Sequence, residues 1–437
     1  MRMSKRFIVR NGRYAQTQAD ANCNMIEGYM VVENGFIVYI GESLPDHYKE
    51  DAEWFDGSGL FFMPGLVNTH GHAAMTLLRG YGDDMVLQKW LQEKMWPMEA
   101  KFTDQDVYWG TSLAVLEMLK SGTTTFVDMY DHMGQVAKVV EQAGIRAGLM
   151  RGAIGLCSEE VQQMKLEEAV QIALEWNGRA DGRIKTLLAP HAPYTCPPAF
   201  IEKFVQAAHD HDLMLHTHMS ETLAEVEQNV QDYGLRPVAH LEKLGFFSRP
   251  SYIAHGVHLN DEEIETLAKY KVGVSHNPAS NLKLASGVAR VPALLKAGVT
   301  VSLGTDGAAS NNNLDMFEEM RLAALIHKGV SGDPTAVPAA EAMRIATVYG
   351  AHTLQMHDVG YLQAGMKADF IAVDVDQPHL LPHTDLVSHM VYAASGKDVK
   401  HVWVDGKQIV NDGVCLTLDE EQIRHEASKC FEGLLTR

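Results

Sequence analysis

The sequence contains little cysteine, and its cysteines are scattered. Five occur among 437 residues, with no CxxC pair. They are Cys23, Cys157, Cys196, Cys415 and Cys430. An odd, sparse set argues against a disulfide framework and is typical of a reducing compartment.

Long apolar runs are missing as well. No apolar stretch approaches the roughly 18 residues that a membrane-spanning helix needs. The segment Met1–Gly12 has basic residues but no apolar run behind them, so it lacks the pattern of a secretory signal peptide. We therefore expect a cytoplasmic protein with no membrane partner.

Basic residues are in deficit. The chain has 37 Lys and Arg against 56 Asp and Glu, a formal charge of −19. Nucleic acids and anionic membranes bind basic surfaces, so neither is an expected partner. With 46% hydrophobic and 21% charged residues, the composition is that of an ordinary globular protein. We expect a small-molecule partner, and a homo-oligomer is compatible with this composition.

Both ends of the chain are patterned as short strands joined by tight turns. The expected strands are Arg6–Arg10, Tyr29–Glu33, Phe36–Ile40, Ala368–Asp374, Val399–Val404 and Lys407–Val410. The turn signals beside them are Asn11-Gly12, Asn34-Gly35 and Asp405-Gly406. Asn-Gly and Asp-Gly between apolar runs favour hairpins. We expect residues 1–62 and 366–437 to form one composite β-sandwich domain.

In the middle of the chain, residues 63–365, short apolar runs alternate with helical patterns. The expected strands are Gly65–His70, Thr123–Asp128, Ile145–Arg151, Ile184–His191, Met214–Met219, Tyr252–His255, Val272–His276 and Val299–Thr305. Helical patterns include Asp104–Lys120, Pro198–His209, Thr222–Asp232, Asp261–Lys269 and Val291–Ala297. Eight such alternations predict an α/β fold, a (β/α)8 TIM-like barrel that forms the catalytic domain.

A polar or ionisable residue stands at the end of each expected barrel strand. These residues are His70, Asp128, Arg151, His191, His218, His255, His276 and Asp306. The carboxyl ends of the strands form the rim that carries the active site in barrels of this type. The sequence therefore places a site there.

Two HxH motifs supply candidate metal ligands. Alternate residues of a strand face the same way, so His70 and His72 can bind one ion through their imidazole nitrogens. In the second motif, His218 lies nearer the carboxyl end than His216, which we expect one layer deeper, hydrogen-bonded in the core. The alternative for His70 and His72 is a pair of hydrogen-bonded loop histidines.

Three further residues complete the candidate chemistry. Asp306 can complete a shell of three nitrogens and one oxygen and accept a proton from the attacking water, although a helix N-cap is its alternative. Glu221 is placed to exchange protons with that water, its alternative being a solvated carboxylate or an N-cap. His255 can hydrogen-bond the reacting oxygen or serve as a structural histidine, and His276 is expected to line the site.

These motifs, in this order, resemble the amidohydrolase superfamily, and within it the deaminase and triazine-hydrolase branch. They are Pro64–His72, His218–Glu221, His255, Ser275–Pro278 and Gly304–Asp306. The resemblance covers essentially the whole chain. It implies zinc bound by His70, His72, His218 and Asp306, with Glu221 and Asp306 transferring protons. It also implies a zinc-dependent aminohydrolase that acts on cyclic amidines, deaminating adenine nucleosides such as 5′-methylthioadenosine and S-adenosylhomocysteine at C6.

One absence indicates a single ion. Two-metal members of this superfamily carry a carboxylated lysine at the end of the fourth strand, where this chain has Leu187–His191, while Lys185 lies at that strand's beginning. We expect one metal, zinc, with Fe²⁺ or another divalent ion as the alternative. The His-x-Glu with Pro-Cys-x-x-Cys signature of other zinc deaminases is also missing.

The resemblance also implies substrate contacts. Glu99 matches a family residue that accepts hydrogen bonds from both ribose hydroxyls. Arg151 matches a residue that reaches the far end of the substrate, and His191 matches a residue that contacts the nucleoside. Their alternatives are a surface carboxylate, a salt-bridged arginine and a structural histidine. A second arginine for an amino-acid tail has no match here, so the preferred nucleoside stays open. The rival functions are a triazine hydrolase or a guanine or cytosine deaminase, and, more remotely, a non-catalytic barrel.

Overall fold

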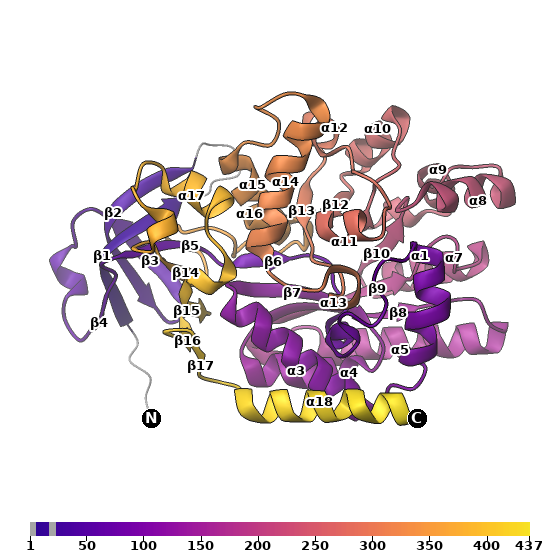
Figure 1. The fold of residues 1–437 in the computed structure, drawn as a ribbon, viewed down its shortest axis with the longest axis horizontal. Helices are drawn as coiled ribbons and strands as arrows, with labels where there is room; N and C mark the ends of the chain where they lie inside the picture. The colour runs from indigo at the N-terminus through magenta and orange to yellow at the C-terminus, as the bar shows by residue number, and fades with distance from the viewer. Residues whose placement is uncertain (1–5, 17–22) are drawn as a thin grey trace.

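The computed structural model of the protein describes residues 6–16 and 23–437. Within these ranges, no helix is both long and apolar enough to cross a bilayer. Figure 1 shows a β-sheet built from both ends of the chain beside a larger barrel built from its middle.

Within the described residues, the barrel has eight parallel strands, each hydrogen-bonded to its neighbour in chain order. They are β6 (Leu66–Asn68), β7 (Thr123–Tyr130), β8 (Arg146–Ala153), β9 (Ile184–Pro190), β10 (Met214–Met219), β11 (Ser251–His255), β12 (Gly273–His276) and β13 (Val301–Leu303). Each overlaps one of the eight strands expected from the sequence.

Hydrogen bonds just past the ends of β6 and β13 join the first strand to the last. The amide of Thr69 donates to the carbonyl of Leu303 at 2.8 Å, and the amide of Asp306 donates to the carbonyl of His70 at 3.0 Å. The ring is thereby closed at its carboxyl end, and the predicted (β/α)8 architecture is confirmed.

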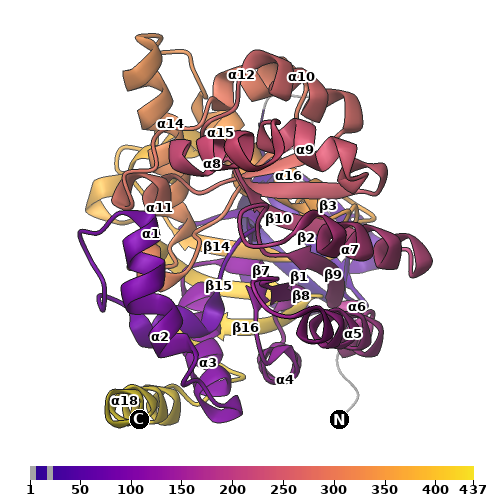
Figure 2. The same ribbon diagram turned by 90° about the vertical axis from the view of Figure 1, so that its right-hand side faces the viewer.

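Helices surround the strands (Figure 2). Those of the barrel are η2 (Ala73–Leu78), α1 (Leu87–Lys89), η3 (Trp90–Met95), α2 (Trp96–Glu99), α3 (Asp104–Lys120), α4 (Met133–Ala143), α5 (Glu159–Trp176), α6 (Arg179–Gly182), α7 (Pro198–Asp210), α8 (Leu223–Tyr233), α9 (Pro237–Lys243), η4 (Phe246–Ser248), α10 (Asp261–Tyr270), α11 (Pro278–Lys283), α12 (Val291–Lys296), α13 (Ala308–Asn311), α14 (Met316–Ser331), α15 (Ala339–Ala346) and α16 (Val348–Thr353). Side-chain caps define several starts: Thr103 caps α3 and Asn260 caps α10, each in a reciprocal capping box.

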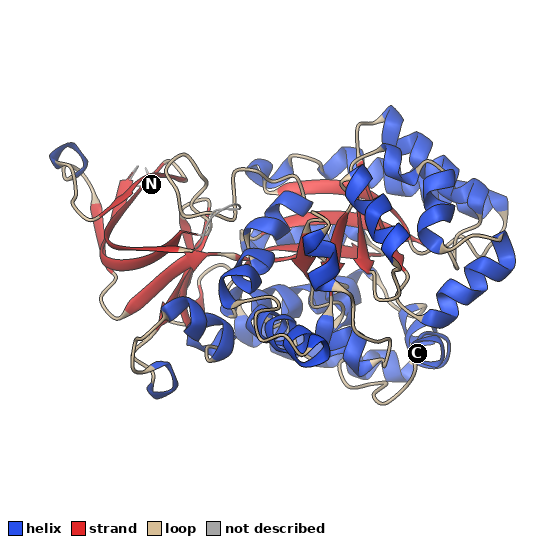
Figure 3. Cartoon of the chain, turned by 90° about the horizontal axis from the view of Figure 1, so that it is seen from above, coloured by secondary structure: helices blue, strands red, loops and turns tan. Residues whose placement is uncertain are grey.

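The two ends of the chain pair into one mixed sheet, nine-stranded in the described residues, which lies to one side of the barrel in Figure 3. Its strands are β1 (Arg6–Gln16), β2 (Asn24–Glu33), β3 (Phe36–Gly41), β4 (Glu53–Asp56), β5 (Leu60–Pro64), β14 (Phe370–Asp374), β15 (Val399–Val404), β16 (Lys407–Asn411) and β17 (Val414–Cys415). The sheet is continuous from β3 to β17 and encloses aromatic side chains, with the rings of Phe370 and Trp403 stacked at 4.6 Å. The separate β-structure from both ends is confirmed, and the exact domain boundaries stay a prediction.

Two of the three expected turns are present. Asn34-Gly35 joins β2 to β3 and Asp405-Gly406 joins β15 to β16, with all four residues at positive φ. The turn expected at Asn11-Gly12 is wrong, because β1 runs through it. Asn11 takes a φ of 56° inside a bulge, where the pairing of β1 with β2 shifts register.

The remaining helices accompany the last strands: η1 (Asp46–Tyr48), η5 (Pro378–Leu380), α17 (Leu386–Tyr392), η6 (Gly396–Asp398) and α18 (Glu420–Thr436). Helix α18 leaves the sheet and lies along α3 of the barrel (Figure 1). Lys120 pairs with Glu420 and Arg437 pairs with Asp106, both at 2.8 Å. The chain therefore ends on the barrel, not on the sheet.

Candidate metal and substrate site

A cavity of about 420 Å³ opens at the carboxyl ends of the barrel strands. Seven of the residues singled out from the sequence line it: Glu99, His72, His191, His218, Glu221, His255 and Asp306. His70 is fully buried just beneath. Apolar and aromatic side chains form much of the remaining wall, including Leu87, Trp90, Trp96, Phe102 and Met129.

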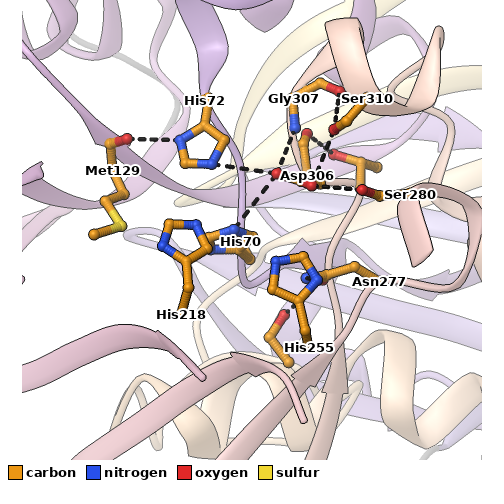
Figure 4. A network of polar contacts seen from close by, with 12 residues as sticks. His70, His72, Met129, His218, His255, Asn277, Ser280, Asp306, Gly307 and Ser310 are labelled. Atoms are coloured by element: carbon orange, nitrogen blue, oxygen red, sulfur yellow. Dashed lines mark hydrogen bonds and ion pairs between the residues drawn. The ribbon is translucent and has the colours of Figure 1, made fainter. Parts of the chain in front are cut away.

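The three histidines and the aspartate expected to bind a metal converge at the floor of this cavity (Figure 4). Ligand atoms of His70, His72 and His218 lie within 4.8 Å of one another. Oδ1 of Asp306 lies 3.2 Å from Nε2 of His72 and 3.5 Å from Nε2 of His70. The arrangement brings three nitrogens and one carboxylate oxygen to a common point.

Backbone acceptors fix the tautomers of two of these histidines. The Nδ1 atoms of His72 and His218 lie 2.7 Å from the carbonyl oxygens of Met129 and His191 respectively. A carbonyl only accepts, so each Nδ1 carries the proton and donates it. Each Nε2 therefore faces the centre, where it can bind a metal once it carries no proton; burial lowers the pKa of His72, but the Asp306 carboxylate outweighs this and raises it to about 9.

His70 is oriented by a second histidine. Nδ1 of His216 donates to the carbonyl of Tyr252 at 3.1 Å, so Nε2 of His216 is an acceptor, and Nδ1 of His70 donates to it at 3.0 Å. Nε2 of His70 is buried without a hydrogen-bond partner among the described residues. An orphaned lone pair at this point fits a metal ligand. His216 lies one layer deeper, as the sequence predicted.

Hydroxyl and amide donors hold the Asp306 carboxylate. Oδ2 accepts from Ser280 Oγ at 2.6 Å and from Ser310 Oγ at 2.9 Å, and Oδ1 accepts from the amide of Gly307 at 2.9 Å. Asp306 has a positive φ of 61° and precedes α13 without being its N-cap, which is Gly307. The helix-cap alternative is therefore excluded.

Glu221 is buried, at 3% exposure, at the wall beside this floor. Its Oε2 lies 3.7 Å from Nε2 of His255, and its Oε1 accepts from Ser286 Oγ at 3.4 Å. The N-cap of α8 is Thr222, so the solvated-loop and N-cap alternatives for Glu221 are both excluded. Burial raises the pKa of Glu221, which favours a carboxyl that gains and loses a proton.

His255 presents its Nε2 to the cavity. Its Nδ1 donates to Oδ1 of Asn281 at 2.8 Å, so Nε2 is left facing Glu221. His276 was expected to line the site but is absent from the described lining. It is buried beside His327 instead, with their Nε2 atoms 3.2 Å apart.

Residues expected to contact substrate differ in placement. Glu99 lines the cavity and accepts from the hydroxyl of Tyr130 at 2.7 Å, while burial raises its pKa. His191 lines it too, and its Nδ1 lies 2.9 Å from the Thr195 hydroxyl. Burial lowers the pKa of His191 to about 3, so its ring is neutral.

Arg151 is held away from the described lining by ion pairs. Its Nε lies 2.7 Å from Glu168, its Nη2 lies 3.3 Å from Asp131, and its Nη1 donates to the Gly152 carbonyl at 2.8 Å. Among the described residues that line the cavity, Lys165 of α5 is the one lysine or arginine. The substrate role of Arg151 stays a prediction.

Tyr130 and Lys165 are among the lining residues that the sequence analysis did not single out. Tyr130 stands two positions after Asp128 in β7, so strand alternation could have shown that it shares the face of that residue. Lys165 lies within helix α5, and nothing in the local sequence pattern indicates that its side chain reaches a cavity. Its Nζ donates to the carbonyl of Ile154 at 2.8 Å.

Comparison with known proteins agrees with this geometry. The amidohydrolase family model matches residues 61–409. The chain is 49% identical over 431 residues, 98% of both chains, to 5-methylthioadenosine/S-adenosylhomocysteine deaminase of Halalkalibacterium halodurans. Among solved structures it is similar to an adenosine deaminase from Xanthomonas campestris with bound zinc, with TM-score 0.91, 35% identity and 99% of both chains covered.

A triazine hydrolase from "Arthobacter aurescens" is also similar in structure, with TM-score 0.87, 25% identity, and 98% of this chain and 99% of that chain covered. The family model spans most of the sequence, and the curated relative is similar along nearly the whole length of both chains. The chain therefore belongs to the amidohydrolase family.

Proposed function

We propose that the protein is a zinc-dependent deaminase of adenine nucleosides, with 5′-methylthioadenosine and S-adenosylhomocysteine as its substrates. The observation that carries this proposal is the similarity, over 98% of both chains, to a deaminase named for these two compounds. The products are ammonia and the corresponding inosine derivatives.

One divalent ion would be held by His70, His72, His218 and Asp306, whose donor atoms already converge. Three imidazoles and a carboxylate suit zinc, as they suit Fe²⁺ and other borderline ions. Such an ion, when bound, lowers the pKa of a water molecule towards neutrality and so supplies the nucleophile.

The surrounding residues move protons and steady charge. Asp306 accepts a proton from the attacking water, and Nε2 of His255 hydrogen-bonds the oxygen that adds to C6. Glu221 protonates the ring nitrogen next to C6, which makes that carbon electrophilic. A proton delivered to the amino group then releases ammonia. The raised pKa of the buried Glu221 supports its role as the acid.

Substrate recognition uses other residues that line the same cavity. Tyr130 occupies Oε1 of Glu99, which leaves Oε2 to accept from ribose hydroxyls. Nδ1 of His191 is occupied by Thr195, which leaves Nε2 for the nucleoside. Trp90, Trp96 and the other apolar side chains of the wall suit a purine and a thioether.

The lining also offers two opposite charges for an amino-acid tail. Lys165 and Asp131 both line the cavity, so that an α-carboxylate would lie beside the lysine and an α-ammonium beside the aspartate. Lys165→Gln should raise KM for S-adenosylhomocysteine about tenfold, the loss of one exposed charge-assisted bond. The KM for 5′-methylthioadenosine, which has no charged tail, should stay within twofold of the native value. Steady-state kinetics on both substrates measure this, and equal changes in KM contradict it.

The rival function is triazine hydrolysis or deamination of free guanine or cytosine. The similarity to a triazine hydrolase at 25% identity is the reason to test triazine hydrolysis. Glu99 discriminates, because a substrate without ribose gives its carboxylate no partner. An ammonia- and chloride-release screen across adenosine, 5′-methylthioadenosine, S-adenosylhomocysteine, guanine, cytosine and chlorotriazines separates the candidates. The non-catalytic alternative predicts no product from any of them.

A further inference from the structure

We propose that Glu225, a buried carboxylate on α8, is a positioning residue that fixes Glu221 for proton transfer. The inference rests on the proposed function of Glu221 and extends it to a second residue. Glu225 lies outside the described lining of the cavity, so any effect it has on the reaction must pass through its neighbours.

The contacts of Glu225 are with the backbone that carries Glu221. Its Oε1 accepts from the amide of Ser220 at 2.7 Å, and its Oε2 accepts from the amide of Glu221 at 2.8 Å. The carbonyl of Ser220 accepts in turn from the amide of His258 at 2.9 Å. The short segment that bears Glu221 is therefore held both through its amide N–H groups and through the carbonyl of Ser220.

This segment needs such support because it is neither strand nor helix. Strand β10 ends at Met219 and α8 begins at Leu223, and between them Ser220 takes a positive φ of 54°. That conformation is uncommon for a residue with a side chain and persists only where its surroundings enforce it. The paired bonds to Glu225 supply that constraint.

The burial and the hydrogen bonds of Glu225 also indicate a role beyond packing. It is 2% exposed and, among the described residues, has no lysine, arginine or histidine within ion-pair distance. Burying a carboxylate without a cation is costly unless hydrogen bonds stabilise it. The two amides are its side-chain partners, and both lie in the segment that carries the acid.

Precise placement of Glu221 matters because proton transfer requires hydrogen-bond distance, and a misplacement of about 1 Å can reduce turnover about a hundredfold. Among the described residues, the polar contacts of the Glu221 carboxylate are Ser286 Oγ, at 3.4 Å, and His255 Nε2, at 3.7 Å. These are long contacts. The backbone, held by Glu225, therefore determines where the Glu221 side chain points.

The test compares Glu225→Gln with Glu227→Gln, the same change at an exposed position of the same helix. Glutamine keeps the size but accepts with one oxygen only, so one amide loses its partner. Glu225→Gln should lower kcat for 5′-methylthioadenosine about ten- to a hundredfold, with KM within threefold and the bound metal per chain unchanged. Glu227→Gln should match the native enzyme.

A double-mutant cycle with Glu221→Gln isolates the mechanism. If Glu225 acts through Glu221, the double variant should be no slower than Glu221→Gln alone. Additive losses, a native kcat in folded Glu225→Gln, or loss of metal along with activity would each overturn the proposal.

A folding defect in Glu225→Gln does not block the test. Glu225→Asp keeps the charge but withdraws it by one methylene, and it should show the same lowered kcat at unchanged KM; a native kcat there overturns the proposal. A native enzyme that releases no ammonia from any adenine nucleoside contradicts the proposed function instead. An active native enzyme with a fully active Glu225→Gln variant contradicts only the positioning role.

Discussion

At the scale of single residues, the acceptors behind the imidazoles determine what the site can bind. The HxH spacing was enough to predict that His70, His72 and His218 would face one point. It could not show that the Met129 carbonyl would accept from His72, or that His216, expected one layer deeper, would accept from His70, because those partners come from other strands. Strand alternation predicts which way a side chain points, whereas hydrogen-bond partners across the barrel depend on the register between strands.

His216 provides a direct test of this orientation. His216→Phe keeps the ring that stacks on Tyr252 at 4.0 Å but removes the acceptor for Nδ1 of His70. Metal affinity should fall roughly 10- to 100-fold, as for other partners of ligating histidines. Native protein should hold one ion per chain, by elemental analysis, and competition with a chelator measures the affinity. The control is His211→Phe, at an exposed position, which should change nothing; equal metal retention in both variants contradicts the account.

Glu99 tests the ribose contact. Glu99→Ala removes a carboxylate that accepts charge-assisted bonds, each worth about 1.5–3 kcal/mol, so kcat/KM for adenosine-type substrates should fall roughly ten- to several-hundred-fold. Deoxyadenosine analogues should be poor substrates of the native enzyme, and Glu99→Ala should lower their kcat/KM less. Ammonia release from paired ribo and deoxyribo substrates measures this, with the exposed Glu93→Ala as control. Equal losses on both sugars would remove the ribose contact and favour the free-base or triazine alternatives.

At the scale of elements, the local pattern predicted the barrel well and the β-sheet less completely. All eight barrel strands were found, because each is a short buried apolar run between helical patterns, and α3 coincides with its expected range. The turn signal at Asn11-Gly12 failed because β1 pairs with β2, β4 and β5, and these long-range bonds carry the strand through a bulge. The same Asn-Gly pair forms a real turn at Asn34-Gly35, between β2 and β3.

The β-sheet and the barrel share a buried charge cluster that no local pattern could reveal. Arg146, at the start of β8, is 3% exposed and contacts Asp369 at 2.8 Å and Asp405 at 2.6 Å. These two aspartates lie more than 200 residues further along the chain, beside β14 and β15. At the scale of the whole molecule, this cluster ties the barrel that carries the site to the sheet built from the chain ends.

Removing one partner tests the contribution of that cluster to stability. Asp369→Asn leaves the buried Arg146 without its bidentate carboxylate, so the free energy of unfolding should fall by about 3 kcal/mol. Chemical denaturation of the native and variant proteins measures the difference. The exposed Asp376→Asn serves as control and should stay within about 0.5 kcal/mol. A native-like Asp369→Asn variant would mean that the Arg146–Asp369 pair contributes nothing to stability.

The account as a whole depends on one activity. The most direct measurement is ammonia release from 5′-methylthioadenosine and S-adenosylhomocysteine by zinc-loaded protein, followed together with the conversion of the adenine absorbance to that of hypoxanthine. We expect one ammonia per nucleoside converted, activity lost on chelation and restored by zinc, and weak or no turnover of guanine, cytosine and chlorotriazines. Fully loaded protein that leaves both adenine nucleosides unchanged, while hydrolysing a free base or a triazine, would contradict the account.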